Sequence, residues 1–132
     1  MNEIRRLSPQ ESWSALQADE RAVLLDVRAT LEYGFVGHPI GAVHVPWKEW
    51  PLWQVSPAFV ETVRRLVPDT DTAIFVLCRS GQRSLDAAKA LQEAGYSNLS
   101  NIEEGFEGSL DADKHRGTLG GWRFHGLPWE QG

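Results

Sequence analysis

The sequence contains a single cysteine among its 132 residues and lacks any long hydrophobic run. One cysteine excludes an internal disulfide, so we expect a reducing environment, most simply the cytoplasm. Residues 1–6 lack the apolar stretch of a secretory signal, and no run approaches membrane-spanning length, so no membrane partner is expected. Basic residues are also in deficit. The formal net charge of −5 disfavours nucleic acid as a partner.

Internal repeats, low-complexity tracts and linker-like stretches are absent as well. The 132 residues suffice for one domain with a real core and are too few for two ordinary domains. The hydrophobic fraction of 42% and the charged fraction of 23% are typical of a globular protein. We therefore expect residues 1–132 to form a single domain.

Short β-like runs alternate with helical patterns along the chain. Ser8-Pro9-Gln10-Glu11 is a capping box and predicts a helix start. A second start is predicted at Ser56-Pro57, and a third helix is expected to end near Gly95. The predicted strands are residues 22–26, 42–45, 73–77 and 97–102. This alternation indicates an α/β fold, in which helices cover both faces of a parallel sheet.

Cys78 follows the predicted strand at residues 73–77 and precedes a helical pattern. In parallel sheets, ligands bind beyond the carboxyl ends of the strands, and Asp26 ends another such strand. Backbone N–H groups at a helix start attract anions, and Arg79 and Arg83 add positive charge. Cys78 is therefore expected to be a thiolate nucleophile near neutral pH. An inert buried thiol, the alternative, fits poorly with the charged residues that follow.

Several stretches follow the landmarks of a known family. They are Leu24 to Arg28, Glu32-Tyr33, Gly37 to Pro46, Cys78-Arg79-Ser80-Gly81-Gln82-Arg83-Ser84, Leu91 to Tyr96, Asn101 and Glu104-Gly105-Phe106. Over nearly its whole length the sequence resembles the single-domain rhodaneses, which are thiosulfate sulfurtransferases. The resemblance implies a sheet of about five parallel strands flanked by helices, with no metal or organic cofactor. It also implies a thiosulfate-like sulfur donor, and an acceptor that is cyanide or a thiol, either small or carried by a protein.

The resemblance further implies two-step covalent catalysis at Cys78. The Cys78 thiolate would take the outer sulfur of the donor and hold it as a persulfide. The N–H groups of the following loop would bind that sulfur; the loop residues are Arg79, Ser80, Gly81, Gln82, Arg83 and Ser84. Arg79 is the predicted contact for the donor's sulfonate. Ser84 is expected to cap the next helix, to donate to the persulfide, or to do both.

Three charged residues are expected to support this loop from outside it. Arg83 is predicted to brace the loop by pairing with Asp26 or Glu32. Asp26 ends an apolar run, where an unpaired carboxylate would be costly, so it should have a partner nearby. Arg28 and Glu32 are predicted to form a structural ion pair. No histidines or cysteines have metal-ligand spacing, so no metal site is expected.

Loop length favours sulfur transfer over phosphate chemistry. Four residues separate Cys78 from Arg83, one fewer than in tyrosine phosphatases and their arsenate-reducing relatives. The shorter loop should form a tighter ring of donors, which suits a terminal sulfur better than a phosphoryl group. A phosphatase or arsenate reductase is therefore the weaker alternative. A persulfide carrier or regulatory binding module with little turnover stays open, because it needs the same reactive sulfur.

Residues 107–121 are an apparent insertion relative to minimal rhodaneses. We expect a surface loop; the alternative is a lid that brings His115 or Arg116 near the anion pocket. A cluster of tryptophans also follows the predicted strand at residues 42–45, where the side chains would line the pocket, meet a partner or simply pack. These tryptophans are Trp47, Trp50 and Trp53.

Overall fold

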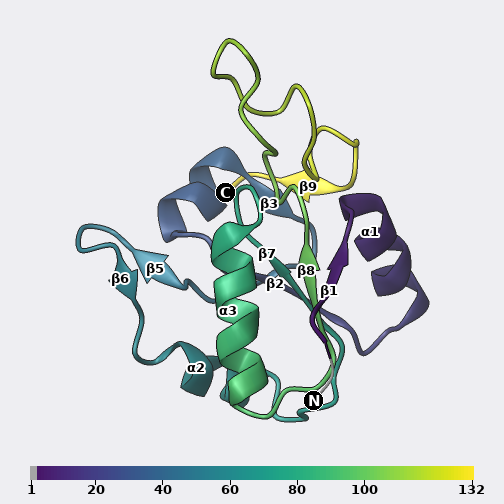
Figure 1. Cartoon of the computed structure of the whole chain (residues 1–132), viewed down its shortest axis with the longest axis vertical. Coiled ribbons are helices and arrows are strands. Elements are labelled where there is room, and N and C mark those ends of the chain that lie inside the picture. The colour runs from purple at the N-terminus through teal and green to yellow at the C-terminus, as the bar shows by residue number, and fades with distance from the viewer. Residues whose placement is uncertain (1–2) are drawn as a thin grey trace.

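The computed structural model describes residues 3–132. Its central feature is a five-stranded sheet with the strand order β1-β8-β7-β2-β4, in which all neighbouring strands are parallel (Figure 1). The strands are β1 (Arg5–Leu7), β2 (Val23–Asp26), β4 (Val43–His44), β7 (Ile74–Leu77) and β8 (Leu99–Ile102). The prediction of a parallel sheet is confirmed, with β1 as an edge strand that the sequence patterns did not predict.

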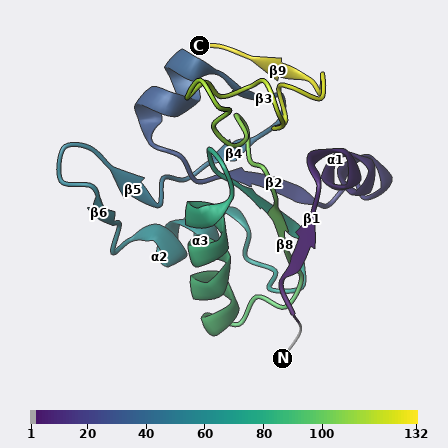
Figure 2. The same ribbon diagram turned by 45° about the horizontal axis from the view of Figure 1, so that its top comes forward.

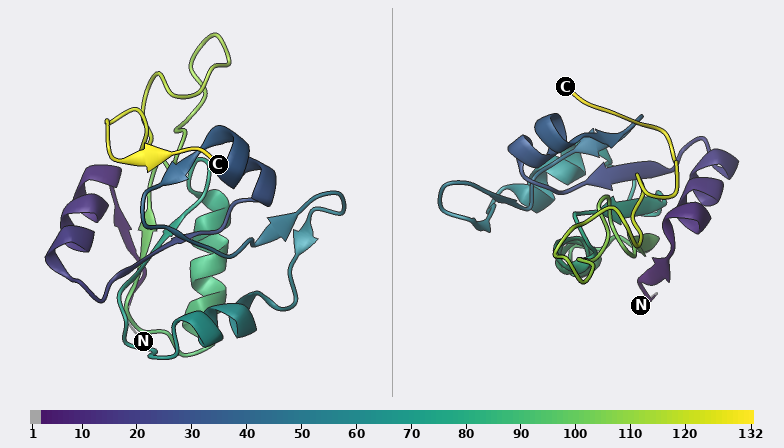
Figure 3. Two further views of the ribbon diagram at one scale, coloured as in Figure 1. Left: turned by 180° about the vertical axis from the view of Figure 1, so that it is seen from behind. Right: turned by 90° about the horizontal axis from the view of Figure 1, so that it is seen from above.

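Helices cover both faces of the sheet, as predicted. They are α1 (Pro9–Ala18), α2 (Phe59–Leu66) and α3 (Gln82–Glu93). Seen from above, α1 and α3 lie on opposite sides of the sheet (Figure 3). Leu25 and Val76 point to the face that packs against α2 and α3, whereas Leu24 and Phe75 point to the face covered by α1. Both faces of β2 and β7 are thus buried, which explains their continuous apolar sequences.

The predicted start of α1 is confirmed and that of α2 is corrected. The Glu11 N–H donates to Ser8 Oγ at 3.1 Å, and the Ser8 N–H donates back to Glu11 Oε1 at 2.8 Å. At α2, Ser56 accepts a bond from the Phe59 N–H at 3.2 Å through its carbonyl, so Ser56-Pro57 lies in a turn. The helix begins at Phe59, without a side-chain cap.

The remaining elements are short. A π-helical segment, η1 (Glu32–Val36), precedes β3 (His38–Pro39), and β3 pairs with the C-terminal strand β9 (Trp129–Glu130). Strands β5 (Lys48–Glu49) and β6 (Gln54–Val55) form a hairpin that projects beside α2 (Figure 2). Across residues 3–132, no helix is long and apolar enough to cross a membrane.

Residues 107–121 form an irregular segment that rises beyond the sheet (Figure 1). The carboxylate of Asp111 organises it: it accepts from the N–H groups of Asp113 and His115 at 2.8 Å and from the Thr118 hydroxyl at 2.6 Å. The Thr118 hydroxyl and the His115 N–H hold the pKa of Asp111 below its ordinary value. The segment is therefore an ordered surface loop.

Candidate active site

The loops after β2 and β7 meet at one edge of the sheet. These two strands are neighbours, and Asp26 at the end of β2 lies opposite Leu77 at the end of β7. Cys78 follows Leu77 directly, so its side chain lies beyond the carboxyl edge, where open parallel sheets bind ligands. The predicted position of the cysteine is confirmed.

The sulfur of Cys78 lies at the start of α3. Gly81, whose backbone has a φ of 118°, turns the chain into this helix. Its N–H donates to Cys78 Sγ at 3.1 Å, and Ser84 Oγ lies 3.2 Å from the same sulfur. Cys78 itself is only 1% exposed. The helix start and the Gly81 N–H together favour negative charge at this position.

The backbone at residues 105–107 holds the start of the cysteine loop in place. The N–H groups of Phe106 and Glu107 donate to the carbonyls of Cys78 and Arg79, at 2.8 and 3.0 Å. Gly105 lies against the same carbonyls; a Cβ at this residue would come within 2.5 Å of the Cys78 oxygen. The loop conformation therefore depends on a residue without a side chain at position 105.

The sulfur opens into a pocket of about 260 Å³. Its walls combine cations, a carboxylate and aromatic rings; the lining residues are Glu32, Trp50, Trp53, Cys78, Arg79, Ser80, Gln82 and Arg83. Trp50 and Trp53 come from the β5–β6 hairpin and stack on each other with ring centroids 4.5 Å apart. Trp47 is buried instead and packs on Phe59. Two of the three clustered tryptophans thus line the pocket.

Arg83 is held in the pocket wall by Glu32. Its two terminal nitrogens donate to the two carboxylate oxygens at 2.7 and 2.9 Å, and its guanidinium lies 5.1 Å from the centre of the Trp53 ring. Burial disfavours the charged forms of both side chains, but the hydrogen bonds and attraction between them outweigh this effect. The pKa of Glu32 therefore lies below its ordinary value, and the pKa of Arg83 lies above its ordinary value. The prediction that Arg83 pairs with Asp26 or Glu32 is confirmed for Glu32.

The predicted ion pair between Arg28 and Glu32 is wrong. Arg28 instead donates to both carboxylate oxygens of Asp26, at 2.9 and 2.7 Å, and all of this pair is buried. Asp26 therefore has the partner that its burial required. Arg28 also donates to the Gly37 carbonyl at 2.6 Å, so the pair ties the end of β2 to the segment after η1. Neither residue lines the Cys78 pocket.

Arg79 differs from Arg83 because its charge is available. It lines the pocket and is exposed, and within residues 3–132 it forms no salt bridge. Its guanidinium is therefore free to meet an incoming anion near the sulfur. Arg83 is already occupied by Glu32.

The segment at residues 107–121 contributes nothing to this pocket. Neither His115 nor Arg116 lines it, and Arg116 instead donates to the Gly108 carbonyl at 2.7 Å. The expectation of a surface loop is met, and the lid is not formed. Within residues 3–132, no group of three or more His, Cys, Asp or Glu side chains has the arrangement of a metal site.

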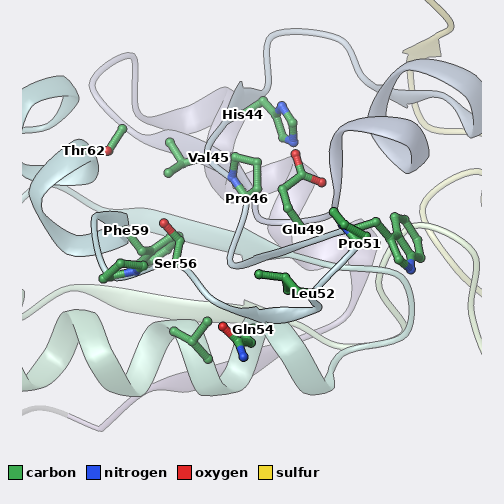
Figure 4. Close-up of a pocket in the computed structure, with 13 residues that line it drawn as sticks. His44, Val45, Pro46, Glu49, Pro51, Leu52, Gln54, Ser56, Phe59 and Thr62 are labelled. Atoms are coloured by element: carbon green, nitrogen blue, oxygen red, sulfur yellow. The ribbon is translucent and has the colours of Figure 1, made fainter.

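A larger hollow of about 430 Å³ lies under the β5–β6 hairpin (Figure 4). Leu52 and Gln54 line it from the hairpin, and Phe59 and Thr62 line it from α2. None of residues 78–84 contributes to it, so it is separate from the Cys78 sulfur. The smaller Cys78 pocket is therefore the candidate active site.

Comparison with known proteins identifies the family of the chain. The family model of the rhodanese-like domain matches residues 8–112. A protein of uncharacterised function from Rickettsia rickettsii is 34% identical over 131 residues, which cover 96% of this chain and 98% of that protein. The thiosulfate sulfurtransferase GlpE of Pseudomonas entomophila is 34% identical over 107 residues, covering 81% of this chain and 85% of GlpE.

A solved structure is similar over the whole length. The crystal structure of Rv0390 from M. tuberculosis superposes with a TM-score of 0.89 at 38% identity, and the match covers 100% of both chains. The parallel sheet, the cysteine at the end of β7 and these similarities lead to one conclusion. The chain belongs to the rhodanese-like family, and its relatives include a thiosulfate sulfurtransferase.

Proposed function

We propose that the protein is a thiosulfate sulfurtransferase that carries the transferred sulfur on Cys78. One observation carries the proposal: Cys78 Sγ lies 3.1 Å from the Gly81 N–H at the start of α3 and opens into a cationic pocket. A nucleophile in this position can form a covalent intermediate whose negative charge the helix start stabilises. Residues 1–132 act as one unit in this proposal, with residues 107–121 as a peripheral insertion.

The first step transfers the outer sulfur of the donor. The Cys78 thiolate attacks that sulfur, a new S–S bond forms, and the S–S bond of thiosulfate breaks. Its electron pair leaves with sulfite, so a thiolate and thiosulfate dianion become a persulfide anion and sulfite dianion. In the second step cyanide or a thiolate attacks the outer sulfur and returns the electron pair of the S–S bond to Cys78.

The charged residues of the pocket divide the work. Arg79 binds the sulfonate end of the donor, because its guanidinium lines the pocket and is unpaired within residues 3–132. Arg83, held by Glu32, keeps the loop and the pocket wall in place. Ser80, Gln82 and the backbone of the loop surround the outer sulfur of the persulfide.

The surface beside the pocket supports a thiol acceptor larger than cyanide. A neighbouring, largely apolar hollow is lined by Leu31, Glu32, Phe35, Val36 and Trp50, and it shares Glu32 and Trp50 with the Cys78 pocket. Leu31 and Phe35 are 68% and 82% exposed. A small dianion needs no such surface, whereas a thiol carried by a protein or an apolar molecule would contact it. This observation also keeps the persulfide-carrier function as a second candidate.

The test is mass spectrometry of protein incubated with thiosulfate. We expect Cys78 to gain the mass of one sulfur atom, removable by dithiothreitol or cyanide, and we expect no gain in Cys78→Ser. Absence of this labile sulfur from the wild-type protein would refute the proposal. Multiple turnover with thiosulfate and an acceptor thiol identifies an enzyme; stoichiometric loading without turnover identifies a carrier.

A further inference from the structure

A buried serine, Ser84, contacts the reactive sulfur, and a buried asparagine, Asn101, contacts that serine. Ser84 Oγ is 3.2 Å from Cys78 Sγ and 2.5 Å from Asn101 Oδ1. Ser84 and Asn101 are both 0% exposed, and neither belongs to the pocket lining. Asn101 can therefore influence the sulfur only through its neighbours: the Ser84 hydroxyl, and Gly81, whose carbonyl accepts from Asn101 and whose N–H donates to Cys78 Sγ.

The neighbours of Asn101 allow its amide only one orientation. Its Nδ2 donates to the Gly81 carbonyl at 3.1 Å and to the Glu103 carboxylate, and both of these groups can only accept. Glu103 is held in turn by Arg6, at 2.9 Å. Oδ1 must therefore face Ser84 as an acceptor. The Gly81 carbonyl is also within reach of Ser84 Oγ, at 3.1 Å, but it already accepts from Asn101 Nδ2, so the single hydroxyl proton goes to the nearer Asn101 Oδ1.

Cys78 Sγ and Asn101 Oδ1 therefore compete for the proton of the Ser84 hydroxyl. When Cys78 is a thiol, its S–H can donate to Ser84 Oγ while Ser84 donates to Asn101, and all three groups are satisfied. When Cys78 ionises, the charged sulfur is the stronger acceptor. Ser84 can turn toward it only by leaving Asn101 Oδ1 buried without a donor, which is costly.

A persulfide removes this conflict. Its inner sulfur is bonded to the outer one and is neutral, and the negative charge lies on the outer sulfur in the loop. Ser84 can then keep its bond to Asn101. We propose that Asn101 is a positioning residue that withholds the Ser84 proton from Cys78 Sγ, and thereby favours the loaded persulfide over the free thiolate. The persulfide half of this statement rests on the proposed function; the thiolate half does not.

The decisive measurement is the rate of Cys78 alkylation by iodoacetamide as a function of pH. We expect Asn101→Ala to move the midpoint of this profile down by about one pH unit, the effect of one hydrogen bond to an ionised sulfur. Below the midpoint, alkylation should be about tenfold faster than in wild type. In a Ser84→Ala background the same substitution should shift the midpoint much less, because no hydroxyl proton is left to release and only the bond from Asn101 to the Gly81 carbonyl is lost.

Glu103 loses its bond to Asn101 but keeps its ion pair with Arg6, and none of the charged side chains around Cys78 is substituted in these variants. These side chains are Arg79, Arg83, Glu32, Asp26, Arg28 and Glu103. Asn98→Ala serves as the matched control, since Asn98 precedes the same strand and its side chain contacts the Asp71 carbonyl and Arg5 and neither Ser84 nor Cys78. Asn101→Leu keeps more of the side-chain volume, carries the same prediction and replaces Asn101→Ala if that variant does not fold. An unchanged or raised midpoint, or an equal shift in both backgrounds, would overturn the role of Asn101.

A second measurement addresses the persulfide. At a fixed ratio of sulfite to thiosulfate, and at a pH above both alkylation midpoints, where unloaded Cys78 is a thiolate, we expect the loaded-to-unloaded ratio of Cys78 to fall about tenfold in Asn101→Ala, matching the gain in thiolate stability. Equal loading in both proteins would overturn this half of the proposal. If wild type takes up no sulfur at all, the proposed function fails, and the alkylation profiles still decide whether Asn101 holds the Ser84 proton.

Discussion

Arg83 and Glu32 form a two-pronged ion pair between positions 51 residues apart, with N–O distances of 2.7 and 2.9 Å. The pair joins the first turn of α3 to η1, and Trp53 lies over the guanidinium. Both side chains are largely buried, at 15% and 10% exposure. One cation of the cysteine loop is therefore paired, whereas the other, Arg79, forms no salt bridge within residues 3–132 and is the one that we propose binds the donor.

This division predicts different kinetic effects for the two arginines. Arg79→Ala should raise the KM for thiosulfate about tenfold with little change in kcat, because it removes binding of the charged donor. Arg83→Ala should lower the free energy of unfolding by about 3 kcal/mol, since it leaves Glu32 buried without a partner, and should lower kcat as well. Steady-state kinetics and urea unfolding measure both effects. Pure KM effects of equal size in both variants would contradict the division.

The ion pair also predicts a pH dependence of stability. The pKa of Glu32 in the folded protein lies below its ordinary value of 4.5, because the hydrogen bonds and charge of Arg83 outweigh the effect of burial. The stabilisation is therefore complete above about pH 4.5 and is lost as the pH falls through the folded value. We expect the stability difference between wild type and Glu32→Gln to shrink on acidification. Urea unfolding from pH 7 to pH 3 measures it, with the exposed Glu61→Gln as the control; a constant difference would contradict the prediction.

Loop length should decide which ligand the loop can hold. One glycine inserted between Gly81 and Gln82 would widen the ring of N–H donors and move the Gly81 N–H relative to Cys78 Sγ. Loss of one such preorganised donor costs on the order of 3 kcal/mol, so sulfur transfer should fall roughly a hundredfold. The fold should survive, because a longer turn adds little loop-closure entropy. Transfer assays with circular dichroism test this, and a folded variant with wild-type transfer would show that loop length does not set the chemistry.

Gly105 and Gly126 provide a matched pair for testing the support beneath the loop. Both have left-handed backbones, with φ of 64° and 73°, but a Cβ would meet the Cys78 carbonyl at 2.5 Å in the first case and nothing within 4 Å in the second. Gly126→Ala should therefore cost only about 1 kcal/mol for the backbone conformation. Gly105→Ala should cost more and also reduce sulfur transfer. Thermal unfolding and transfer assays compare them, and equal effects would argue against the support.

Short sequence patterns predicted the helix whose start is capped by its own residues, and the strands that are buried on both faces. The capping box at Ser8 set the start of α1, and the apolar runs before Asp26 and Cys78 gave β2 and β7. Strand β1 was not predicted from the sequence, because Arg5-Arg6-Leu7 is short and largely polar. It becomes a strand only by pairing with β8. Tertiary pairing of this kind leaves no periodic pattern in the sequence.

The candidate site shows the same limit. Cys78 and its loop were predicted from one contiguous motif. The partner of Glu32 was not settled from sequence, because Arg28 lies four positions away and looked suitable, whereas the folded chain brings Arg83 to it. The connection of Asn101 to Ser84 was also missed; a polar pair, Ser100-Asn101, inside an otherwise apolar strand was the available signal, since a buried amide needs polar partners.

The burial of the nucleophile restricts the order of events. Cys78 is 1% exposed and opens into a pocket of about 260 Å³, with Gly81 and Ser84 against its sulfur. A donor and an acceptor that both need this atom must then use the same entrance in turn. For the proposed sulfur transfer, such an arrangement predicts ping-pong kinetics, with parallel double-reciprocal plots. An excess of either substrate should slow the reaction, because it occupies the shared entrance and excludes the other substrate.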